Sequence, residues 1–245
     1  MHKLPWGLRL ALFLVLELVI GEFGVSLLVG RLHLAYLPHL VLYKVIELLV
    51  IIALSWWLVH QQVFYTRMRW GTMAALLIFW LVIAATTWHV AGSQRVIAGV
   101  ATGIVAAATE ELLFRGVVFG QLLKRWHNLG AAMLVSAVLF GSLHLINLTH
   151  QSAFMTAIQI MQAAAMGMML AAMYARSGTL LAPMSFHFSL DFIAVAIHGT
   201  KGLPTGDNQL LLSGTMFWVM VYVACAVIII YGSKRPLRLL HKITN

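Results

Sequence analysis

Long apolar stretches constrain the fold of this sequence more than any other feature. A helix needs about 20 predominantly apolar residues to cross the hydrocarbon core of a bilayer. Stretches of this length fill most of the 245 residues and leave only short connections. Because lipid satisfies no backbone hydrogen bond, each stretch is expected to be helical. The predicted fold is therefore all-α, a polytopic membrane protein with eight transmembrane helices, at residues 6–30, 38–60, 72–92, 96–123, 131–148, 154–176, 178–199 and 214–232.

The charge content agrees with a membrane protein rather than a soluble one. Charged residues make up 9% of the chain, against about 25% in a typical soluble domain. The net charge of +9 is interpreted as basic loops that face anionic lipid headgroups. No soluble segment combines basic and aromatic residues in a groove, so the lipid bilayer is an expected partner and nucleic acid is not. We expect a single membrane-embedded domain over residues 1–245.

The distribution of basic residues predicts the orientation of the chain. With eight spans and the N-terminus inside, most of the 16 Lys and Arg residues fall in cytoplasmic segments. That set includes Lys3, Arg69, Arg176 and Arg235, and the outer set is Arg31, Arg95 and Lys201. Because cytoplasmic loops carry an excess of Lys and Arg, both termini are expected to be cytoplasmic.

The acidic residues lie where charge is most costly. Of the seven, only Asp207 falls in a clear loop. A charged side chain at the centre of a span costs about 2.5–3.5 kcal/mol on insertion scales, so it needs a partner or a function. Six acids face this requirement: Glu17, Glu22, Glu47, Glu110, Glu111 and Asp191.

The first group of intramembrane charges is interpreted as structural. Lys44 and Glu47 are three residues apart, a spacing that puts them on one helix face and allows an ion pair. Together with Glu17 and Glu22, they can form polar contacts between helices. We expect this group to hold spans together.

The second group begins with "TEELLFRG", residues 109–116. Glu111 and Arg115 are four residues apart, so they can pair along one helix. Glu110 is rotated by about 100° from Glu111 and has no such partner. A carboxylate that is not held in an ion pair can serve as a general base or acid.

Two further predicted spans carry polar residues at helical spacing. Phe140 and His144 share one helix face, and so do His187 and Asp191. Pro183 precedes His187 by four residues and is expected to kink that span, because proline removes a helix hydrogen bond. Two histidines and an aspartate within spans, added to the glutamate pair, predict one shared polar site.

These residues form three ordered motifs that resemble a known family. The motifs are Glu110-Glu111-x-x-x-Arg115, Phe140-x-x-x-His144 and His187-x-x-x-Asp191. They are similar to the motif set of the CPBP intramembrane peptidases, the CAAX protease and bacteriocin-processing family, which includes the Ras-converting CAAX endopeptidase. The resemblance covers roughly residues 96–200, the expected catalytic core. Many relatives have Asn where this chain has Asp191.

The resemblance implies an endopeptidase that hydrolyses a membrane-associated peptide or protein. Glu110 and His144 would activate the attacking water, and His187 and Asp191 would line the opposite side, where the family's His and Asn are proposed to stabilise the oxyanion. Glu111 and Arg115 would hold the geometry, with Phe140 in support. Unlike Asn, an ionised Asp191 cannot donate a hydrogen bond, so it is expected to orient His187 or favour its charged form.

Three alternatives remain open at this stage. The acids Glu110, Glu111 and Asp191 exceed Arg115 by two charges, which protons or a metal could balance, and two His with a Glu are a plausible zinc set. We expect protons, and no cofactor. A proton-coupled transporter also uses intramembrane Glu, Arg and His, although the repeat symmetry of many transporters is not evident. A non-catalytic binding or regulatory member of the same family is the third alternative.

Overall fold

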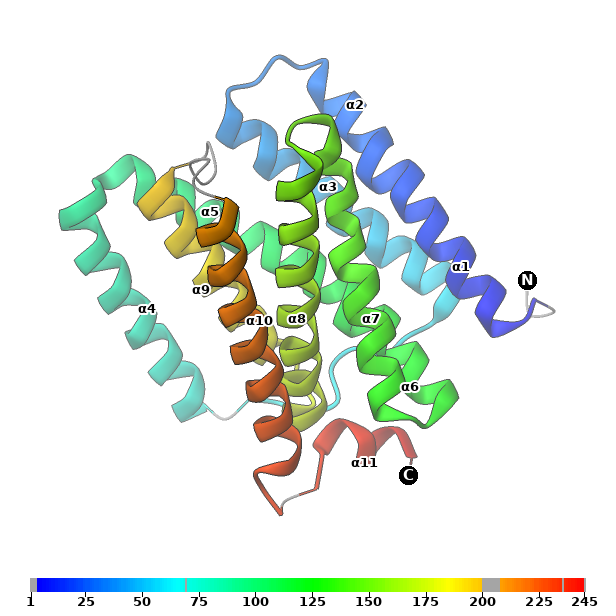
Figure 1. The fold of residues 1–245 in the computed structure, drawn as a ribbon. Helices are drawn as coiled ribbons and strands as arrows, with labels where there is room; N and C mark the ends of the chain where they lie inside the picture. The colour runs from blue at the N-terminus through cyan, green and yellow to red at the C-terminus, as the bar shows by residue number, and fades with distance from the viewer. Residues whose placement is uncertain (1–3, 69, 200–207, 235, 245) are drawn as a thin grey trace. The chain divides into compact units, whose positions relative to one another are not determined.

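The structure is a computed structural model that describes residues 4–68, 70–199, 208–234 and 236–244. These residues form helices and short connections, without a strand among them (Figure 1). Eight helical segments are long and apolar enough to cross a membrane, at Trp6–Gly30, Tyr36–Val59, Trp70–Ala91, Ser93–Trp126, Leu129–Thr149, Ala153–Ser177, Leu181–His198 and Asn208–Tyr231. The predicted all-α polytopic fold is confirmed. Five charges used in the sequence argument, Lys3, Arg69, Lys201, Asp207 and Arg235, lie outside the described residues.

Contacts between Cα atoms divide the chain into two compact units. The first unit comprises Met1–Gln62, Arg67–Leu113 and Met184–Leu203. The second comprises Val63–Thr66, Phe114–Pro183 and Pro204–Asn245. The expectation of one membrane-embedded domain stays a prediction, and each unit is described by itself.

The first unit contains the N-terminal helices and most of α9. Its elements are α1 (Trp6–Leu16), η1 (Glu17–Gly24), α2 (Val25–Gly30), α3 (Tyr36–Leu54), η2 (Ser55–Val59), α4 (Trp70–Ala91), α5 (Ser93–Glu111) and α9 (Leu181–His198). The helix α3 packs against both η1 and α5. No side chain of α4 is buried among the described residues 70–91, and its Trp80 makes edge-to-face contacts with Phe188 and Phe192 of α9. The helix α4 therefore lies at the edge of this unit (Figure 1).

Two glycines let α5 and α9 approach each other closely. A Cβ atom at Gly103 would lie 2.8 Å from Cδ2 and 3.0 Å from the carbonyl oxygen of Phe188. A Cβ atom at Gly99, one turn earlier, would lie 3.0 Å from the carbonyl oxygen of Phe192. Larger residues would push the two backbones apart, because both contacts involve main-chain atoms. This close packing sets the distance between the last turn of α5 and the facing turn of α9.

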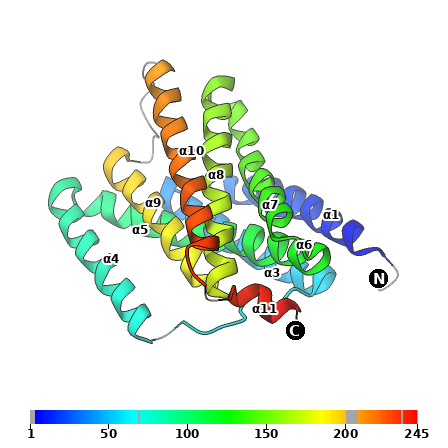
Figure 2. The same ribbon diagram turned by 60° about the horizontal axis from the view of Figure 1, so that its bottom comes forward.

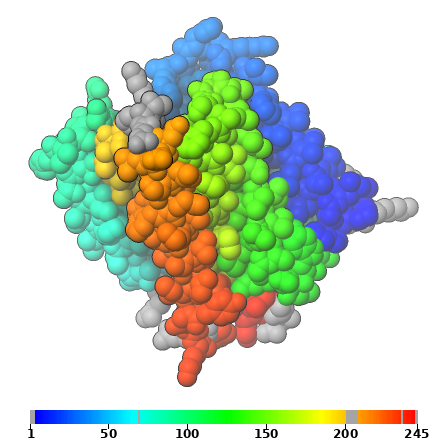
Figure 3. Space-filling model, in the orientation of Figure 1, coloured from blue at the N-terminus to red at the C-terminus, as the bar shows by residue number. Residues whose placement is uncertain are grey.

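The second unit is built around α8. Its elements are η3 (Leu112–Phe119), which continues α5 without a break, α6 (Gly120–Trp126), α7 (Leu129–Leu143), η4 (His144–Thr149), α8 (Ala153–Ser177), α10 (Asn208–Tyr231) and α11 (Arg238–Thr244). Both α7 and α10 pack along α8 (Figures 1 and 2). In the space-filling view α10, in orange to red, adjoins α8 directly (Figure 3). Buried small and aliphatic residues of α8, such as Leu170, Ala171 and Ala172, form the centre of this unit.

Side-chain caps fix the ends of these helices. The side chains of Asn128 and Ser152 accept hydrogen bonds from the first turns of α7 and α8, as is common for helix N-caps. Arg176, on α8, donates to the carbonyl oxygens of Ile229, at 2.8 Å, and of Ile230. These carbonyls belong to the last turn of α10 and have no partner within that helix. Arg176 therefore fastens the end of α10 to α8.

The turn between α8 and α9 corrects the prediction made for Pro183. The helix α8 ends before Gly178, which adopts φ +69°, a left-handed conformation that favours glycine at helix ends. The helix α9 then begins at Leu181, so Pro183 is its third residue. The first four N–H groups of a helix have no intrahelical partner, and proline at this position removes no hydrogen bond. The predicted kink at Pro183 is therefore wrong.

Candidate active site

His187 lies at the centre of a group of acids in the first unit. Its Nδ1 atom is 2.8 Å from Oε1 of Glu111. Its Nε2 atom is 3.7 Å from Oε2 of Glu110 and 3.5 Å from Oδ2 of Asp191. We call these four residues the carboxylate–histidine cluster. One imidazole thus contacts three acids from two helices, all within predicted membrane spans.

Burial distinguishes the two sides of this imidazole ring. Glu111 and His187 are buried, so the bond at Nδ1 is closed to water. The side chains of Glu110 and Asp191, which flank Nε2, retain 18% and 29% of their exposure. The Nε2 side is therefore the more open one, and the two acids there lie beyond ordinary hydrogen-bond distance of the ring.

The local sequence explains how the cluster forms. Glu110 and Glu111 end α5, and His187 and Asp191 are one turn apart on α9. The contact at Gly103 brings these two helices together. Every member of the cluster could be predicted from the sequence, but the bond between Glu111 and His187 could not, because helical spacing predicts contacts within a helix and not between helices.

The bond to Glu111 fixes the orientation of the His187 ring. A histidine whose Nδ1–H donates to a carboxylate has a defined tautomer and presents Nε2 to its surroundings. Asp191 was expected to orient this ring, but the contact at hydrogen-bond distance is made by Glu111. The ion pair expected between Glu111 and Arg115 involves a residue of the second unit and stays a prediction.

In the second unit, Phe140 contacts both Arg115 and His144. Cζ of Arg115 lies 4.1 Å from the centroid of the Phe140 ring, a distance at which a cation and an aromatic ring attract each other. The rings of Phe114 and His144 pack edge-to-face against Phe140, at centroid distances of 5.2 Å and 5.9 Å. Phe140 is buried. It therefore limits the positions open to the His144 ring.

His144 lies at a change of helix geometry rather than within a regular span. The helix α7 ends at Leu143, and His144 begins the 3-10 segment η4. Asn147 of this segment donates to Oε1 of Gln159, on α8, at 2.8 Å, and Gln151 donates to the same atom at 2.8 Å. Gln159 was not singled out in the sequence, although a glutamine within an apolar span is itself a signal. These bonds hold the segment that follows His144 against α8.

Lys44, on α3, lies beside the turn of α5 that carries Glu110 and Glu111. Its Nζ lies 2.9 Å from Oε2 of Glu47, as predicted, and 3.9 Å from Oε2 of Glu22. The hydroxyl of Thr109 donates to the Val105 carbonyl within α5 at 2.7 Å and lies 3.4 Å from the Lys44 carbonyl oxygen. The approach of Thr109 to Lys44 brings α3 next to the end of α5.

Comparisons with known proteins bear on this arrangement. A family model described as Rce1-like, the type II CAAX prenyl endopeptidases, matches residues 92–193. The matched segment includes all three sequence motifs, from Glu110 to Asp191. Neither the curated proteins nor the solved structures gave a match. The family match confirms the resemblance drawn from the motifs, and the eight apolar helices agree with a multi-pass membrane protein.

Proposed function

We propose that this chain, whose residues 92–193 match the Rce1-like family model of type II CAAX prenyl endopeptidases, hydrolyses a peptide bond with water activated by Glu110 and His144. The observation that carries the proposal is the carboxylate–histidine cluster. In this cluster the Glu110 carboxylate is partly exposed, and the His187 imidazole forms a hydrogen bond with the buried Glu111 carboxylate. The expected substrate is a membrane-associated peptide or protein.

Glu110 is proposed as the general base. Its carboxylate is partly exposed and lies 3.7 Å from Nε2 of His187, so no short hydrogen bond to that ring competes with a water molecule. The water oxygen attacks the peptide carbonyl carbon and transfers its proton to Glu110. When the C–N bond breaks, Glu110 returns this proton to the leaving amine, as general acid–base catalysis requires.

His187 is proposed to stabilise the oxyanion. An Nδ1–H that donates to Glu111 leaves Nε2 with a proton only in the doubly protonated ring. Glu110 and Asp191, both near Nε2, supply negative charge that can balance this form. A hydrogen bond from Nε2 to the developing oxyanion stabilises the transition state. Asp191 contributes charge in this scheme, in place of the amide that many relatives carry.

His144 is proposed, by resemblance to the family, to share in activating the water. Its ring is braced by Phe140, and η4 is bonded to α8. If Glu110 and His144 act as one unit, their effects are strongly non-additive. The variant that combines Glu110→Gln with His144→Ala should then cleave no more slowly than Glu110→Gln alone. Losses that multiply would show that the two residues act on separate steps.

The activity can be tested by peptide release from membranes. Membranes that hold the wild-type chain or Glu110→Gln at equal abundance are compared by mass spectrometry. We expect peptides that appear only with the wild-type chain, and equal peptide sets would favour a non-catalytic member of the family. Candidate substrates are then supplied with and without a prenyl group, which identifies the form that is cleaved.

Two further measurements address the remaining alternatives. Cleavage that survives a strong chelator supports the proton-balanced site, whereas loss of cleavage that stoichiometric zinc restores would make His144 and His187 metal ligands. Proton flux through vesicles that depends on Glu110, without any peptide release, would favour a transporter.

A further inference from the structure

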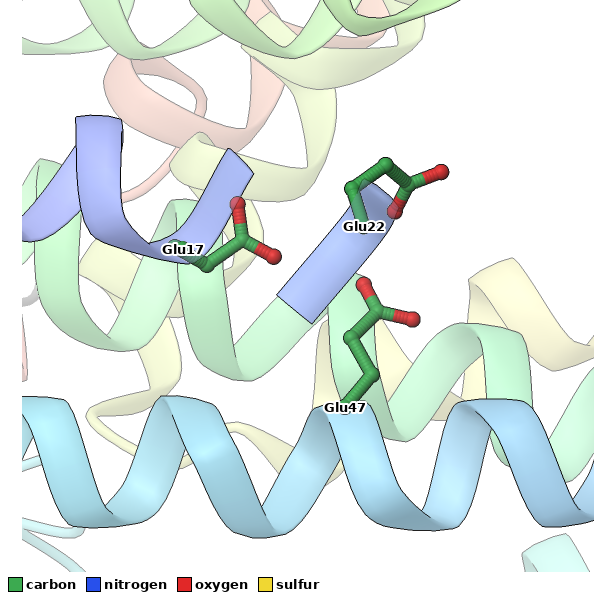
Figure 4. Close-up of side chains that lie close together, drawn as sticks. All are labelled: Glu17, Glu22 and Glu47. Carbon is green, nitrogen blue, oxygen red and sulfur yellow. The ribbon is translucent and has the colours of Figure 1, made fainter. Parts of the chain in front are cut away.

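A second group of acids in the first unit is not used by the proposed mechanism. Glu17 and Glu22 lie on η1 and Glu47 lies on α3. Figure 4 shows the three side chains close together, with Glu47 directed from α3 toward η1. One carboxylate oxygen from each residue lies within 4.8 Å of the others. We call this group the glutamate cluster.

Glu17 is the member that a structural role does not explain. Glu17 is only 3% exposed. Among the described residues, its Oε1 atom has no hydrogen-bond partner. Lys44 contacts the other two acids, at 2.9 Å for Glu47 and 3.9 Å for Glu22. A buried carboxylate without a partner is costly, so Glu17 requires a cation or a proton.

The backbone leaves room for this carboxylate to turn into the cluster. A Cβ atom at Gly21, one turn after Glu17, would lie 3.0 Å from Oε1 of Glu17 and 3.6 Å from Cγ of Glu47. Any larger residue at this position would therefore narrow the space in which the acids meet. The glycine, the unpartnered oxygen and the convergence of three acids are separate observations that indicate the same small space.

We propose that the glutamate cluster binds one hard divalent cation of the size of Ca²⁺. Calcium is held by oxygen ligands at about 2.3–2.6 Å, so two oxygens on one ion lie at most about 4.6–5.2 Å apart. The three carboxylate oxygens lie within 4.8 Å of one another, which falls inside this limit. Carboxylate-only ligand sets suit hard cations rather than zinc or copper.

Charge balance leads to the same ion. Three carboxylates and the Lys44 ammonium leave two negative charges, which one divalent cation neutralises. Glu22 retains 13% of its side-chain exposure and is the most exposed of the three acids. The bound cation would join η1 to α3 and stabilise the first unit, without taking part in peptide hydrolysis.

Calcium binding to the purified full-length chain tests this inference. Chelator-treated protein in detergent is dialysed against radioactive calcium, and its thermal midpoint is measured with and without the ion. We expect one calcium ion per chain and a midpoint that rises with calcium concentration, as ligand binding to the folded state requires. Magnesium serves as the comparison ion and should stabilise less, because it demands shorter bonds.

Variants assign the ion to the glutamate cluster. Glu17→Gln keeps the size of the side chain and should weaken calcium binding by at least about tenfold, whereas Glu110→Gln should bind calcium as the wild type does. Gly21→Ala keeps all three acids and should weaken binding by filling the space, which provides a second test if Glu17→Gln folds poorly. Binding that depends on Glu110 and not on Glu17 would overturn the proposal. So would a wild-type chain that binds no calcium and becomes more stable with Glu17→Gln, because protons would then balance the cluster.

Discussion

The carboxylate–histidine cluster and the glutamate cluster use the same chemistry for different ends. Each gathers three acids around a basic side chain within apolar helices of the first unit. The basic group of the first is an imidazole, whose two nitrogens face different acids. The basic group of the glutamate cluster is the Lys44 ammonium. Among the described residues, Oε1 of Glu17 has no hydrogen-bond partner. An acid count alone therefore does not separate catalysis from ion binding, whereas the chemistry of the basic partner, an imidazole or an ammonium, does.

The largest expected effect is a loss of peptide cleavage when an acid of the carboxylate–histidine cluster is replaced, but not when an acid of the glutamate cluster is replaced. Glu110→Gln should lower the rate of peptide cleavage by about 10²–10⁴-fold, the usual contribution of a general base, while the thermal midpoint stays near that of the wild type. Glu47→Gln should lower the thermal midpoint and leave the cleavage rate near that of the wild type, because the Glu47 carboxylate pairs with Lys44. Cleavage by the purified variants and their thermal unfolding are measured in parallel. Equal losses of activity in both variants would remove the distinction between the clusters.

The next effect concerns stability. Lys44→Met removes the ammonium from the glutamate cluster and should lower the free energy of unfolding by about 3–5 kcal/mol, as expected when one partner of a buried ion pair is lost. The unfolding equilibrium is measured in detergent with a chelator present. Added calcium should restore more stability to Lys44→Met than to the wild type, and an equal gain in both proteins would contradict the charge balance.

A smaller effect is expected from the packing that positions the carboxylate–histidine cluster. Gly103→Ala places a methyl group 2.8 Å from Phe188 and should push α9 away from α5. Because misplacement of a catalytic group by about 1 Å can cost about 10²-fold, cleavage should fall by that order while calcium binding persists. Gly214→Ala is the matched control, since a Cβ there meets nothing within 4 Å. Unchanged cleavage by Gly103→Ala would show that this approach does not set the site.

The smallest effect should come from Glu22. Its contact with Lys44 is long, at 3.9 Å, and its side chain is partly exposed. Without calcium, Glu22→Gln should change the free energy of unfolding by no more than about 1 kcal/mol, as for exposed ion pairs. The same chelator-containing unfolding assay measures this change. A loss as large as that of Lys44→Met would mean that Glu22, and not Glu47, is the main partner of the lysine.

The parts of the structure that depend on one helix at a time could be predicted from the sequence. The eight spans follow from apolar length, because each helix satisfies its own backbone within lipid. The pairs Lys44–Glu47, Phe140–His144 and His187–Asp191 follow from spacing along one helix. These predictions needed no knowledge of how the helices pack.

The parts that depend on helix ends and on packing could not be predicted. Pro183 was expected to kink a span because the start of α9 at Leu181 was not foreseen. The bond between His187 and Glu111 joins residues 76 positions apart and depends on two glycines whose role is visible only in the packed helices. Likewise, Glu17 was judged a structural residue because the sequence does not reveal which oxygens lack a partner.

The exact sequence of the helix α4 matters less than the sequence of either cluster. The packing of α4 inside the first unit comes from Trp80, Ile83 and Ala84, which lie against the core cluster of Val96, Phe192 and Ala196, and none of its side chains is buried among the described residues 70–91. Exchanging one aliphatic residue for another elsewhere on α4 alters neither shape complementarity nor charge. Outside these three contacts the segment therefore specifies a class of residue at each position rather than an identity, and it is a natural place to introduce a spectroscopic label.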